Sequence, residues 1–363
     1  MTIKRTLAHL TVLLGMILFS TNIAVSRGLE VNIMTGSSTG TYIQIGKDIG
    51  ALAEQIGRNM TAVESAGSLE NIEAVRKRPL TQFGIVQSDV LDFIRTFRQD
   101  DIEMRRMANN TRIVFPLYNE EVHIVVRRSS GLNVLADLSG RTVAIGEPNS
   151  GTNLTSTFLF EVANVRPQNM LTISSSEGME QLKTGAVDAF VYVAGAPTKL
   201  LADTNANDDF KILPISSESV GGYYGTSTIK AGTYPFQTED VTTAAVRAVL
   251  MTFEYNPRHN TYFKQSCEAV SEISYLIKEH LDILQATGHP KWKQVDLSAI
   301  PPGWEVAQCV QTALKDNYKL PVNDPIVMPT SASAGSSSTA CECSDLLNPV
   351  AHRLCLMRIC NAE

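Results

Sequence analysis

Between Leu29 and about Val193, short apolar runs alternate with segments of helical periodicity. In the first unit, the apolar run 31–34 is followed by apolar residues spaced three and four apart, at Tyr42, Ile45, Ile49, Leu52 and Ile56. Alternation of strand and helix is typical of βαβ units around a parallel sheet. The chain is therefore expected to fold as an α/β protein.

The alternation is interrupted once, where two apolar runs are separated only by Asn119, Glu120 and Glu121. We expect two adjacent strands here, at 113–118 and 122–126. The alternation then resumes, with strand-like runs at 142–145, 187–193, 223–229 and 241–251 and with helical patterns at 259–284 and 304–314.

This order predicts two α/β lobes joined by two crossovers, the second lobe being inserted in the first. We place the first lobe at residues 27–121 and 228–320, and the second at 122–227. Two sequential domains without a return segment are the alternative.

Composition excludes several other classes of protein. The chain has 363 residues, of which 44% are hydrophobic and 19% charged, and this balance is that of a globular protein. It excludes a mainly disordered chain, a collagen-like repeat and a polytopic membrane protein. The net charge is −6 without a basic tract, so no nucleic-acid partner is expected.

The first 26 residues have the features of a secretory signal peptide. Lys4 and Arg5 precede an apolar run that reaches Phe19, and Ala24 and Ser26 supply the small residues of a cleavage site. We therefore expect export and a periplasmic location. An uncleaved N-terminal anchor is the alternative.

Export changes how the six cysteines are interpreted, because thiols in an oxidising compartment tend to form disulfides. Cys267 and Cys309 lie in helical patterns, and their pairing is left open. The other four, Cys341, Cys343, Cys355 and Cys360, crowd a tail at 341–363 after a Ser-rich linker at 321–340. Two bridges would staple so short a module, and a four-thiolate zinc site is the alternative.

Two similar loops follow the first strand of each series. The first is Gly36-Ser37-Ser38-Thr39-Gly40-Thr41-Tyr42 and the second is Gly146-Glu147-Pro148-Asn149-Ser150-Gly151-Thr152, and both end in Gly-Thr at a predicted helix start. A helix start presents free N–H groups and the positive end of the helix dipole, which favour an anion. Small hydroxyl residues in place of Lys or Arg indicate recognition of a carboxylate, and the missing Lys argues against a nucleotide P-loop.

The first loop also matches the G-x-S-x-G pattern of a hydrolase nucleophile elbow. Ser38 would then be the nucleophile, with a downstream Asp and one of His123, His259, His280 or His289. The pattern is short, however, and follows the first strand, whereas such an elbow follows several strands of sheet. An exported serine hydrolase is therefore only the alternative hypothesis.

Further polar residues stand at predicted strand ends, at 64–71, at 87–89 and around Tyr192. Ser68 and Ser88 could also serve as helix caps, and Tyr192 could belong to the core. Acidic and His clusters with metal-ligand spacing are absent from the sequence, so no metal or cofactor is expected.

Seven motifs in order make the chain resemble the TAXI family of solute receptors, the binding subunits of TRAP-type (tripartite ATP-independent periplasmic) transporters. The resemblance covers about residues 29–318. It rests on the segments 34–42, 67–71, 86–90, 138–146, 149–152, 187–197 and 231–241, among them Met34-Thr35-Gly36, Val86-Gln87-Ser88-Asp89 and Asn149-Ser150-Gly151-Thr152.

The resemblance implies a two-lobe periplasmic-binding-protein fold of type II-like topology, with the ligand cleft between the lobes and a hinge that closes them. It implies a small carboxylate ligand, which is a glutamate-like amino acid, a dicarboxylate or a 2-oxoacid. It also implies TRAP-type membrane permease subunits as partners, and no catalytic role. By position, the implied ligand-binding residues are Thr39, Gly40, Thr41, Tyr42, Ser68, Gln87, Ser88, Asn149, Ser150, Gly151, Thr152 and Tyr192.

Two features depart from the resemblance. Ser37 and Ser38 stand where the family pattern is usually glycine-rich, and the linker and Cys-rich tail lie outside the matching region. We expect a monomer. A third hypothesis keeps the fold but makes the protein the ligand-binding partner of a membrane sensor.

Overall fold

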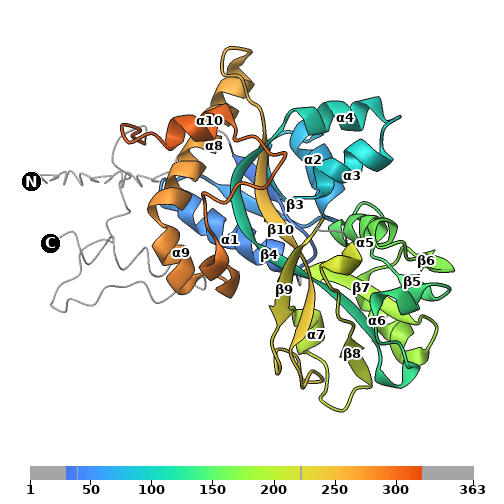
Figure 1. Ribbon diagram of the computed structural model, residues 1–363. Coiled ribbons are helices and arrows are strands. Elements are labelled where there is room, and N and C mark those ends of the chain that lie inside the picture. The colour runs from blue at the N-terminus through green and yellow to red at the C-terminus, as the bar shows by residue number, and fades with distance from the viewer. Residues whose placement is uncertain (1–29, 39, 221–222, 321–363) are drawn as a thin grey trace, which may run out of the picture.

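The computed structural model describes residues 30–38, 40–220 and 223–320, and it has two lobes of mixed α/β structure (Figure 1). The predicted signal peptide, linker and Cys-rich tail lie outside these residues. No helix within the described ranges is both long enough and apolar enough to cross a membrane.

The sheet of the first lobe is built around three parallel strands, β1 (Val31–Met34), β2 (Met60–Val63) and β3 (Thr81–Gln87). Next to β3 lies the antiparallel strand β10 (Val241–Phe253), followed by β4 (Thr111–Arg127). The strand order is therefore β2-β1-β3-β10-β4. The return of the chain in β10, close to its end, completes this lobe.

The sheet of the second lobe continues from the other end of β4. It has the order β4-β7-β5-β6, formed by β7 (Ala189–Ala194), β5 (Thr142–Ala144) and β6 (Asn169–Leu171). Two more strands join the edges, β8 (Phe210–Ile212) on β4 and β9 (Gly225–Ile229) on β10. The lobe boundaries at 121/122 and 227/228 remain a prediction.

One prediction from the sequence is wrong. The runs 113–118 and 122–126 do not form two strands, because β4 continues through Asn119, Glu120 and Glu121 without a turn. The two glutamates are buried and hydrogen-bonded, Glu120 by Tyr42 and Glu121 by Lys291, so their polarity does not force the chain to the surface. The strand exchanges partners at this point: Glu121 is opposite both Ala245 of β10 and Ala194 of β7.

Helices cover both faces of the first lobe's sheet (Figure 1). One face carries α1 (Thr41–Glu54), α8 (Thr261–Glu279), α9 (Leu281–Thr287) and α10 (Gln308–Ala313), and the other carries α2 (Ser68–Lys77), α3 (Val90–Phe97) and α4 (Ile102–Asn109). The predicted apolar stripe of α1 is confirmed, since all five of its residues are buried. Burial of each such side chain contributes roughly 1.5–3 kcal/mol.

The helical patterns near the end of the chain are more broken than predicted. The pattern 259–284 is divided into α8 and α9 at His280, and the helix expected from Trp304 begins only at Gln308. The Trp304 indole N–H instead donates to the Ser88 carbonyl (2.9 Å).

The second lobe has α5 (Gly151–Val162), α6 (Ser175–Thr184) and the short α7 (Lys199–Ala202). Short 3-10 turns complete the described elements, at Arg128–Ser130 (η1), Leu135–Leu138 (η2), Glu218–Val220 (η3) and Pro290–Gln294 (η4). Two apolar clusters on either side of the β7-β5 sheet form the core of this lobe.

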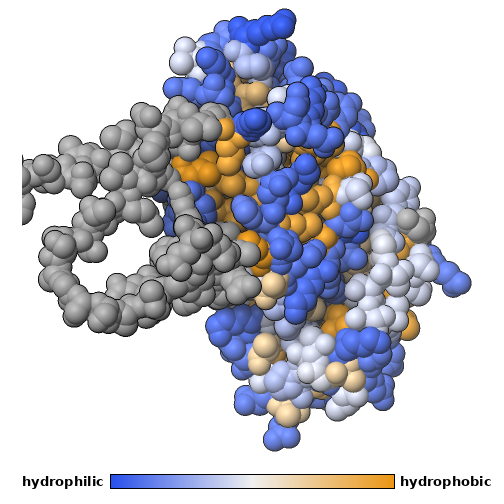
Figure 2. Space-filling model, turned by 90° about the vertical axis from the view of Figure 1, so that its left-hand side faces the viewer, coloured by the Kyte–Doolittle hydropathy of each residue, from blue (hydrophilic) through white to orange (hydrophobic). Residues whose placement is uncertain are grey.

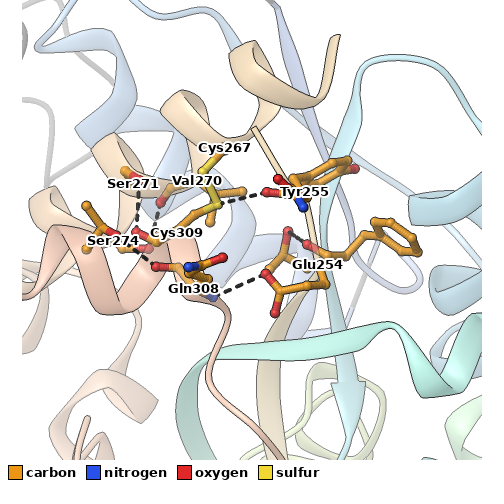
Figure 3. The surroundings of a disulfide bond; sticks show 12 residues. Glu254, Tyr255, Cys267, Val270, Ser271, Ser274, Gln308 and Cys309 are labelled. Carbon is orange, nitrogen blue, oxygen red and sulfur yellow. Dashed lines mark hydrogen bonds between the residues drawn. A yellow bond between two sulfur atoms is a disulfide. The ribbon is translucent and has the colours of Figure 1, made fainter. Parts of the chain in front are cut away.

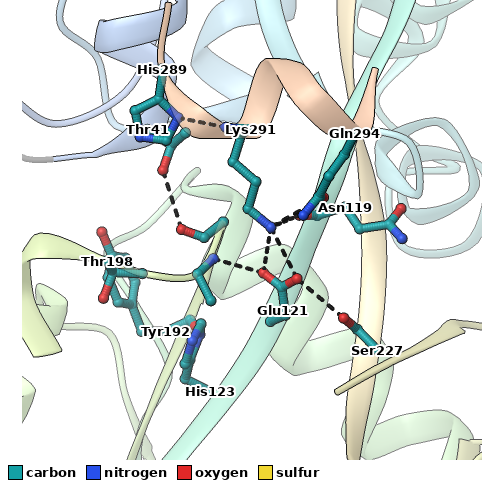
Figure 4. Close-up of polar contacts among 12 residues, drawn as sticks. Thr41, Asn119, Glu121, His123, Tyr192, Thr198, Ser227, His289, Lys291 and Gln294 are labelled. Carbon is teal, nitrogen blue, oxygen red and sulfur yellow. Dashed lines mark hydrogen bonds and ion pairs between the residues drawn. The ribbon is translucent and has the colours of Figure 1, made fainter. Parts of the chain in front are cut away.

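Glu121 connects several segments at the crossover, as Figure 4 shows. Both of its carboxylate oxygens lie 3.0 Å from the Nζ atom of Lys291, which comes from η4. The amide of Ala196, after β7, and the hydroxyl of Ser227, in β9, also donate to it. The carboxylate of Glu121, in β4, thus joins η4 to β9 and to the segment after β7.

Figure 2 shows the side of the molecule that carries α8 to α10. Hydrophobic residues gather there on the upper lobe. The lower lobe is mostly hydrophilic or neutral on this face.

A disulfide bond joins Cys267 of α8 to Cys309 of α10 (Figure 3). Next to it, the Ser271 hydroxyl donates to the carbonyl of Cys309 (2.9 Å), and the amide of Gln308 donates to Glu254 (3.2 Å). The bond closes a segment with a sequence separation of 42 and holds the C-terminal helix of the first lobe on the core.

Replacement of both cysteines, Cys267→Ser with Cys309→Ser, should lower the free energy of unfolding by about 2–4 kcal/mol, because the unfolded chain gains loop entropy. Urea denaturation of the wild type and the double variant measures this difference. A reductant should destabilise the wild type and leave the double variant unchanged, which separates this bond from any effect of the four tail cysteines. Equal stability of the two proteins would contradict the prediction.

Candidate functional site

A cavity of about 180 Å³ lies between the two lobes. The first lobe contributes Gly36, Ser37, Gly40, Thr41, Tyr42, Ser65, Ala66, Gly67, Gln87 and Glu120, and the second contributes Gly146, Glu147, Ser150, Gly151, Thr152, Ser174, Ser175, Ser176, Tyr192, Val193, Ala194 and Leu200. Most of these residues stand at or just after the carboxyl ends of strands, which is the usual place for ligands in α/β sheets. The cavity is smaller than the roughly 300–1,000 Å³ typical for drug-sized ligands.

Three helices begin at the cavity wall. Gly40 is the N-cap of α1, Ser150 that of α5 and Ser174 that of α6. Ser150 and Ser174 accept hydrogen bonds from the backbone amides of Asn153 and Glu177, while Gly40 has no side chain to cap α1. Three positive dipole ends therefore converge on one space, and this arrangement favours a negatively charged group.

Eight of the predicted site residues line this cavity: Gly40, Thr41, Tyr42, Gln87, Ser150, Gly151, Thr152 and Tyr192. Thr39 lies outside the described residues. Whether these residues bind a ligand remains a prediction, but the structure brings the two Gly-Thr loops to opposite walls of one cavity.

Three predicted residues do not line the cavity. The Ser68 hydroxyl accepts from the amide of Gln87 (3.0 Å), and the Ser88 carbonyl accepts from Trp304. Asn149 has a positive φ of 66°, and its carbonyl accepts from the amide of Leu69 in the opposite lobe (3.2 Å). They hold the walls of the site in place rather than facing its interior.

The inference from the sequence missed two contributions to the cavity. Glu120 was assigned to a connection between strands, and Ser174–176 were not singled out. Ser174 could have been found as a serine that precedes a helix, because its hydroxyl has the N-cap role. The sequence offers no comparable signal for Glu120, whose burial depends on contacts across the fold.

Direct hydrogen bonds hold the lobes against each other. Thr155 of α5 donates to Gln87 (3.2 Å) and to Asp89 (3.0 Å), and Tyr224 donates to the same Asp89 oxygen (3.1 Å). Thr41 donates to the carbonyl of Gly195 (3.4 Å). The lobes are thus in contact on more than one side of the cavity.

Burial changes the acidity of several groups in and beside the cavity. It raises the pKa of Glu120 to about 8 and that of Asp89 to about 6, although hydrogen bonds from Tyr42 and Thr155 partly oppose these shifts. Burial, together with the charge of Glu120, raises the pKa of Tyr192 to about 12. Among the described residues that line the cavity there is no Lys, Arg or His.

The geometry does not support the alternative of a serine nucleophile. Both ring nitrogens of His123 are engaged, Nε2 by the Tyr234 hydroxyl (2.7 Å) and Nδ1 by the Tyr192 carbonyl (3.0 Å). Within the described ranges, no hydrogen bond joins Ser38 to a histidine, so no catalytic pair is formed there.

The two-lobe α/β fold with a small cavity between the lobes is that of a periplasmic-type solute-binding protein. The model of the NMT1-like family matches residues 33–297, so the chain belongs to this family.

The chain is similar to several solved structures. Tv2483, described as bound to L-arginine, is 13% identical, with a TM-score of 0.47 over 75% of this chain and 93% of that one. The alkanesulfonate-binding protein SsuA from Xanthomonas axonopodis pv. citri, bound to MOPS, is 17% identical, with a TM-score of 0.43 over 78% and 83%. A TctC solute-binding protein from Polaromonas is 14% identical, with a TM-score of 0.40 over 70% and 87%.

Gly151, at the start of α5, is in close contact with the other lobe. A Cβ atom at Gly151 would lie 2.2 Å from Oε1 of Gln87, which is buried and already accepts from Thr155. Gly151→Ala should therefore prevent full closure and weaken ligand binding at least tenfold. Small-angle X-ray scattering should show a larger radius of gyration than for the wild type.

Gly225→Ala is the matched control for this substitution, since its Cβ would meet nothing closer than the Ala245 carbonyl at 3.5 Å. It should behave as the wild type. A Gly151→Ala protein that closes and binds normally would refute the assignment of the close contact.

Asp89 gives the protein a pH dependence of known sign. Because burial raises its pKa from 3.8 to about 6, its stabilising contribution is complete below pH 4 and is lost as the pH rises through 6. Relative to Asp89→Asn, the wild-type free energy of unfolding should fall by on the order of 2–3 kcal/mol between pH 4 and pH 7.

Urea denaturation at each pH measures this difference. Asp100→Asn, at an exposed position after α3, is the control and should leave the pH dependence of the wild type unchanged. The prediction would be wrong if the free energy of unfolding of the wild type, relative to that of Asp89→Asn, stayed constant or rose between pH 4 and pH 7.

Proposed function

We propose that the protein is an extracytoplasmic solute receptor that binds a small carboxylate and delivers it to a TRAP-type transporter driven by an ion gradient. The ligand class is a glutamate-like amino acid, a dicarboxylate or a 2-oxoacid, and the protein itself has no catalytic role. The observation that carries the proposal is the meeting of the α1 and α5 starts at one cavity between the lobes.

The cavity can hold a carboxylate without a basic side chain. Helix starts contribute about 0.3–1 kcal/mol each, and hydrogen bonds to a charged group about 1.5–3 kcal/mol. The walls supply hydroxyl donors at Ser37 and at Ser174 to Ser176, besides the backbone amides. Several such donors, aimed from both lobes, also give the ligand a preference for the closed form.

The proposed ligand contacts are the eight predicted residues that line the cavity. Thr39 stays in the proposed set because it belongs to the same loop. Ser68, Ser88 and Asn149 support it as positioning residues, through their contacts with Gln87, Trp304 and Leu69.

The transport partner follows from the resemblance to TAXI receptors rather than from the cavity. The seven motifs support it. A receptor of this kind works outside the cytoplasm, which agrees with the predicted signal peptide. We propose a monomer that presents its closed form to the membrane subunits.

A carboxylate that binds the closed form should stabilise the protein against unfolding. At a concentration a hundredfold above the dissociation constant, the free energy of unfolding should rise by about 2.7 kcal/mol. Thermal unfolding with a panel of amino acids, dicarboxylates and 2-oxoacids measures the shift. The Gly151→Ala protein, tested in parallel, should show a much smaller one.

Absence of a shift with every member of the panel would count against a carboxylate receptor. A shift of equal size in wild type and Gly151→Ala would place binding elsewhere. Native mass spectrometry of the purified protein gives an independent measure, because a retained ligand is observed directly.

A further inference from the structure

Glu120 is the one acidic side chain that is both buried and part of the cavity wall among the described residues. It is 2% exposed, and its Oε2 atom accepts a hydrogen bond from the Tyr42 hydroxyl at 2.7 Å. The side chain of Gln87 also hydrogen-bonds to it. Since the Oε1 atom of Gln87 accepts from Thr155, its amide group is the part left to donate to Glu120.

The neighbouring Glu121 has a different environment. Successive side chains of a strand point to opposite faces, and Glu121 is paired with Lys291, whose Nζ atom lies 3.0 Å from both of its oxygens. Lys291 also donates to Asn119 and Gln294. Within the described ranges no ion pair joins Glu120 to a cation, since Lys291 is paired with Glu121.

The charges of the cavity are therefore arranged unequally. The helix starts of α1, α5 and α6 offer positive dipole ends, but the described lining has no basic side chain and has two glutamates, Glu120 inside and the exposed Glu147. A ligand whose only charged groups are carboxylates satisfies the helix starts. Its negative charge, however, repels the Glu120 carboxylate unless Glu120 is protonated. A ligand that also carries a cation satisfies both.

We propose that Glu120 is a specificity-determining residue that binds the protonated amino group of the ligand, so that the protein selects an α-amino acid over the corresponding dicarboxylate or 2-oxoacid. This inference rests on the proposed function and narrows its ligand class. Tyr42 and Gln87 act as positioning residues, since their hydrogen bonds fix the Glu120 carboxyl and favour its ionised form, against the effect of burial.

The pH dependence of binding distinguishes two roles of Glu120: a carboxylate that binds an ammonium group, and a protonated carboxyl that donates to a 2-oxoacid. Burial raises the pKa of Glu120 to about 8, so near pH 7 the empty site holds this carboxyl largely protonated. An ammonium group favours the carboxylate, so binding releases a proton and affinity rises with pH towards 8. A 2-oxoacid would instead need the protonated carboxyl as a donor, and its affinity would fall over the same range.

Other titratable or charged groups surround Glu120. They come from α1, β4, β7 and η4, and are Tyr42, Tyr118, Glu121, Tyr192 and Lys291. Burial raises the pKa of Tyr42 and Tyr118 well above the usual value of 10, and that of Tyr192 to about 12, so these three tyrosines do not titrate between pH 6 and 8. A change of affinity in this range that disappears in Glu120→Gln is thus due to Glu120.

The experiment is isothermal titration calorimetry of the full mature chain between pH 6 and 8, in buffers of different ionisation enthalpy. The probes are two matched pairs, L-glutamate with 2-oxoglutarate and L-alanine with pyruvate, which differ in the amino or keto group. In at least one pair the amino acid should bind at least tenfold more tightly, with release of a proton near pH 7.

Glu120→Gln should lose at least tenfold in affinity for that amino acid and stay within threefold for its 2-oxoacid. Glu120→Asp should keep part of the preference. Glu279→Gln has the same charge change at an exposed position at the end of α8, outside the cavity lining, and should match the wild type. Circular dichroism verifies that each variant is folded.

A wild type that prefers the 2-oxoacid, or a preference that survives in Glu120→Gln, overturns the role of Glu120 but leaves a carboxylate receptor intact. Failure of all four probes and of the wider carboxylate panel overturns the proposed function together with this inference. Proton uptake instead of release on binding of the amino acid also overturns the inference.

Discussion

The buried ion pair between Glu121 and Lys291 is the interaction on which the arrangement of the two lobes depends. Both side chains are almost fully buried, and removal of such charges from water is costly unless every donor and acceptor is satisfied. Here Lys291 also donates to Asn119 and Gln294, and Glu121 also accepts from Ala196 and Ser227. The pair thereby fixes the place where the chain leaves one lobe and returns.

The position of Glu121 couples the crossover to the cavity, because Glu120, the residue before it in β4, faces the opposite side of the strand. Glu120 reaches the cavity and Glu121 the ion pair, so any shift of β4 would displace both carboxylates together. Gln87 makes a similar connection. It lines the cavity, its backbone N–H donates to the Ser68 hydroxyl, and its side-chain oxygen accepts from Thr155 of the opposite lobe. Ligand contacts and lobe contacts therefore share the same side chains.

The sequence predicted the parts of this structure that follow from local pattern. The α1 stripe and the Gly-Thr helix starts are encoded by short-range spacing, and the structure places them as expected. The prediction of two strands in place of β4 failed for a physical reason. A Glu-Glu pair between apolar runs indicates a turn unless distant residues pair or hydrogen-bond with the two carboxyl groups. Lys291 and Tyr42, far from it in sequence, do so. Ser174 to Ser176 were missed because β6, the strand before them, is short and largely exposed, and lacks an apolar run.

Several hydrogen bonds join the lobes, beside an apolar contact in which Leu154 of α5 packs with residues of α3. A typical hydrogen bond contributes only about 0.5–1.5 kcal/mol net, because water satisfies the same groups when the lobes part. The bonds of Thr155, Tyr224 and Leu69 across the lobes are of this kind, and Asp89 weakens the set further, since its ionisation is opposed by burial. The hydrogen bonds therefore add little free energy to the contact between the lobes, and a ligand that bridges the helix starts of both lobes would shift the equilibrium by its own contacts. Such a site could release its ligand once those contacts are broken, as the proposed delivery to a membrane partner requires.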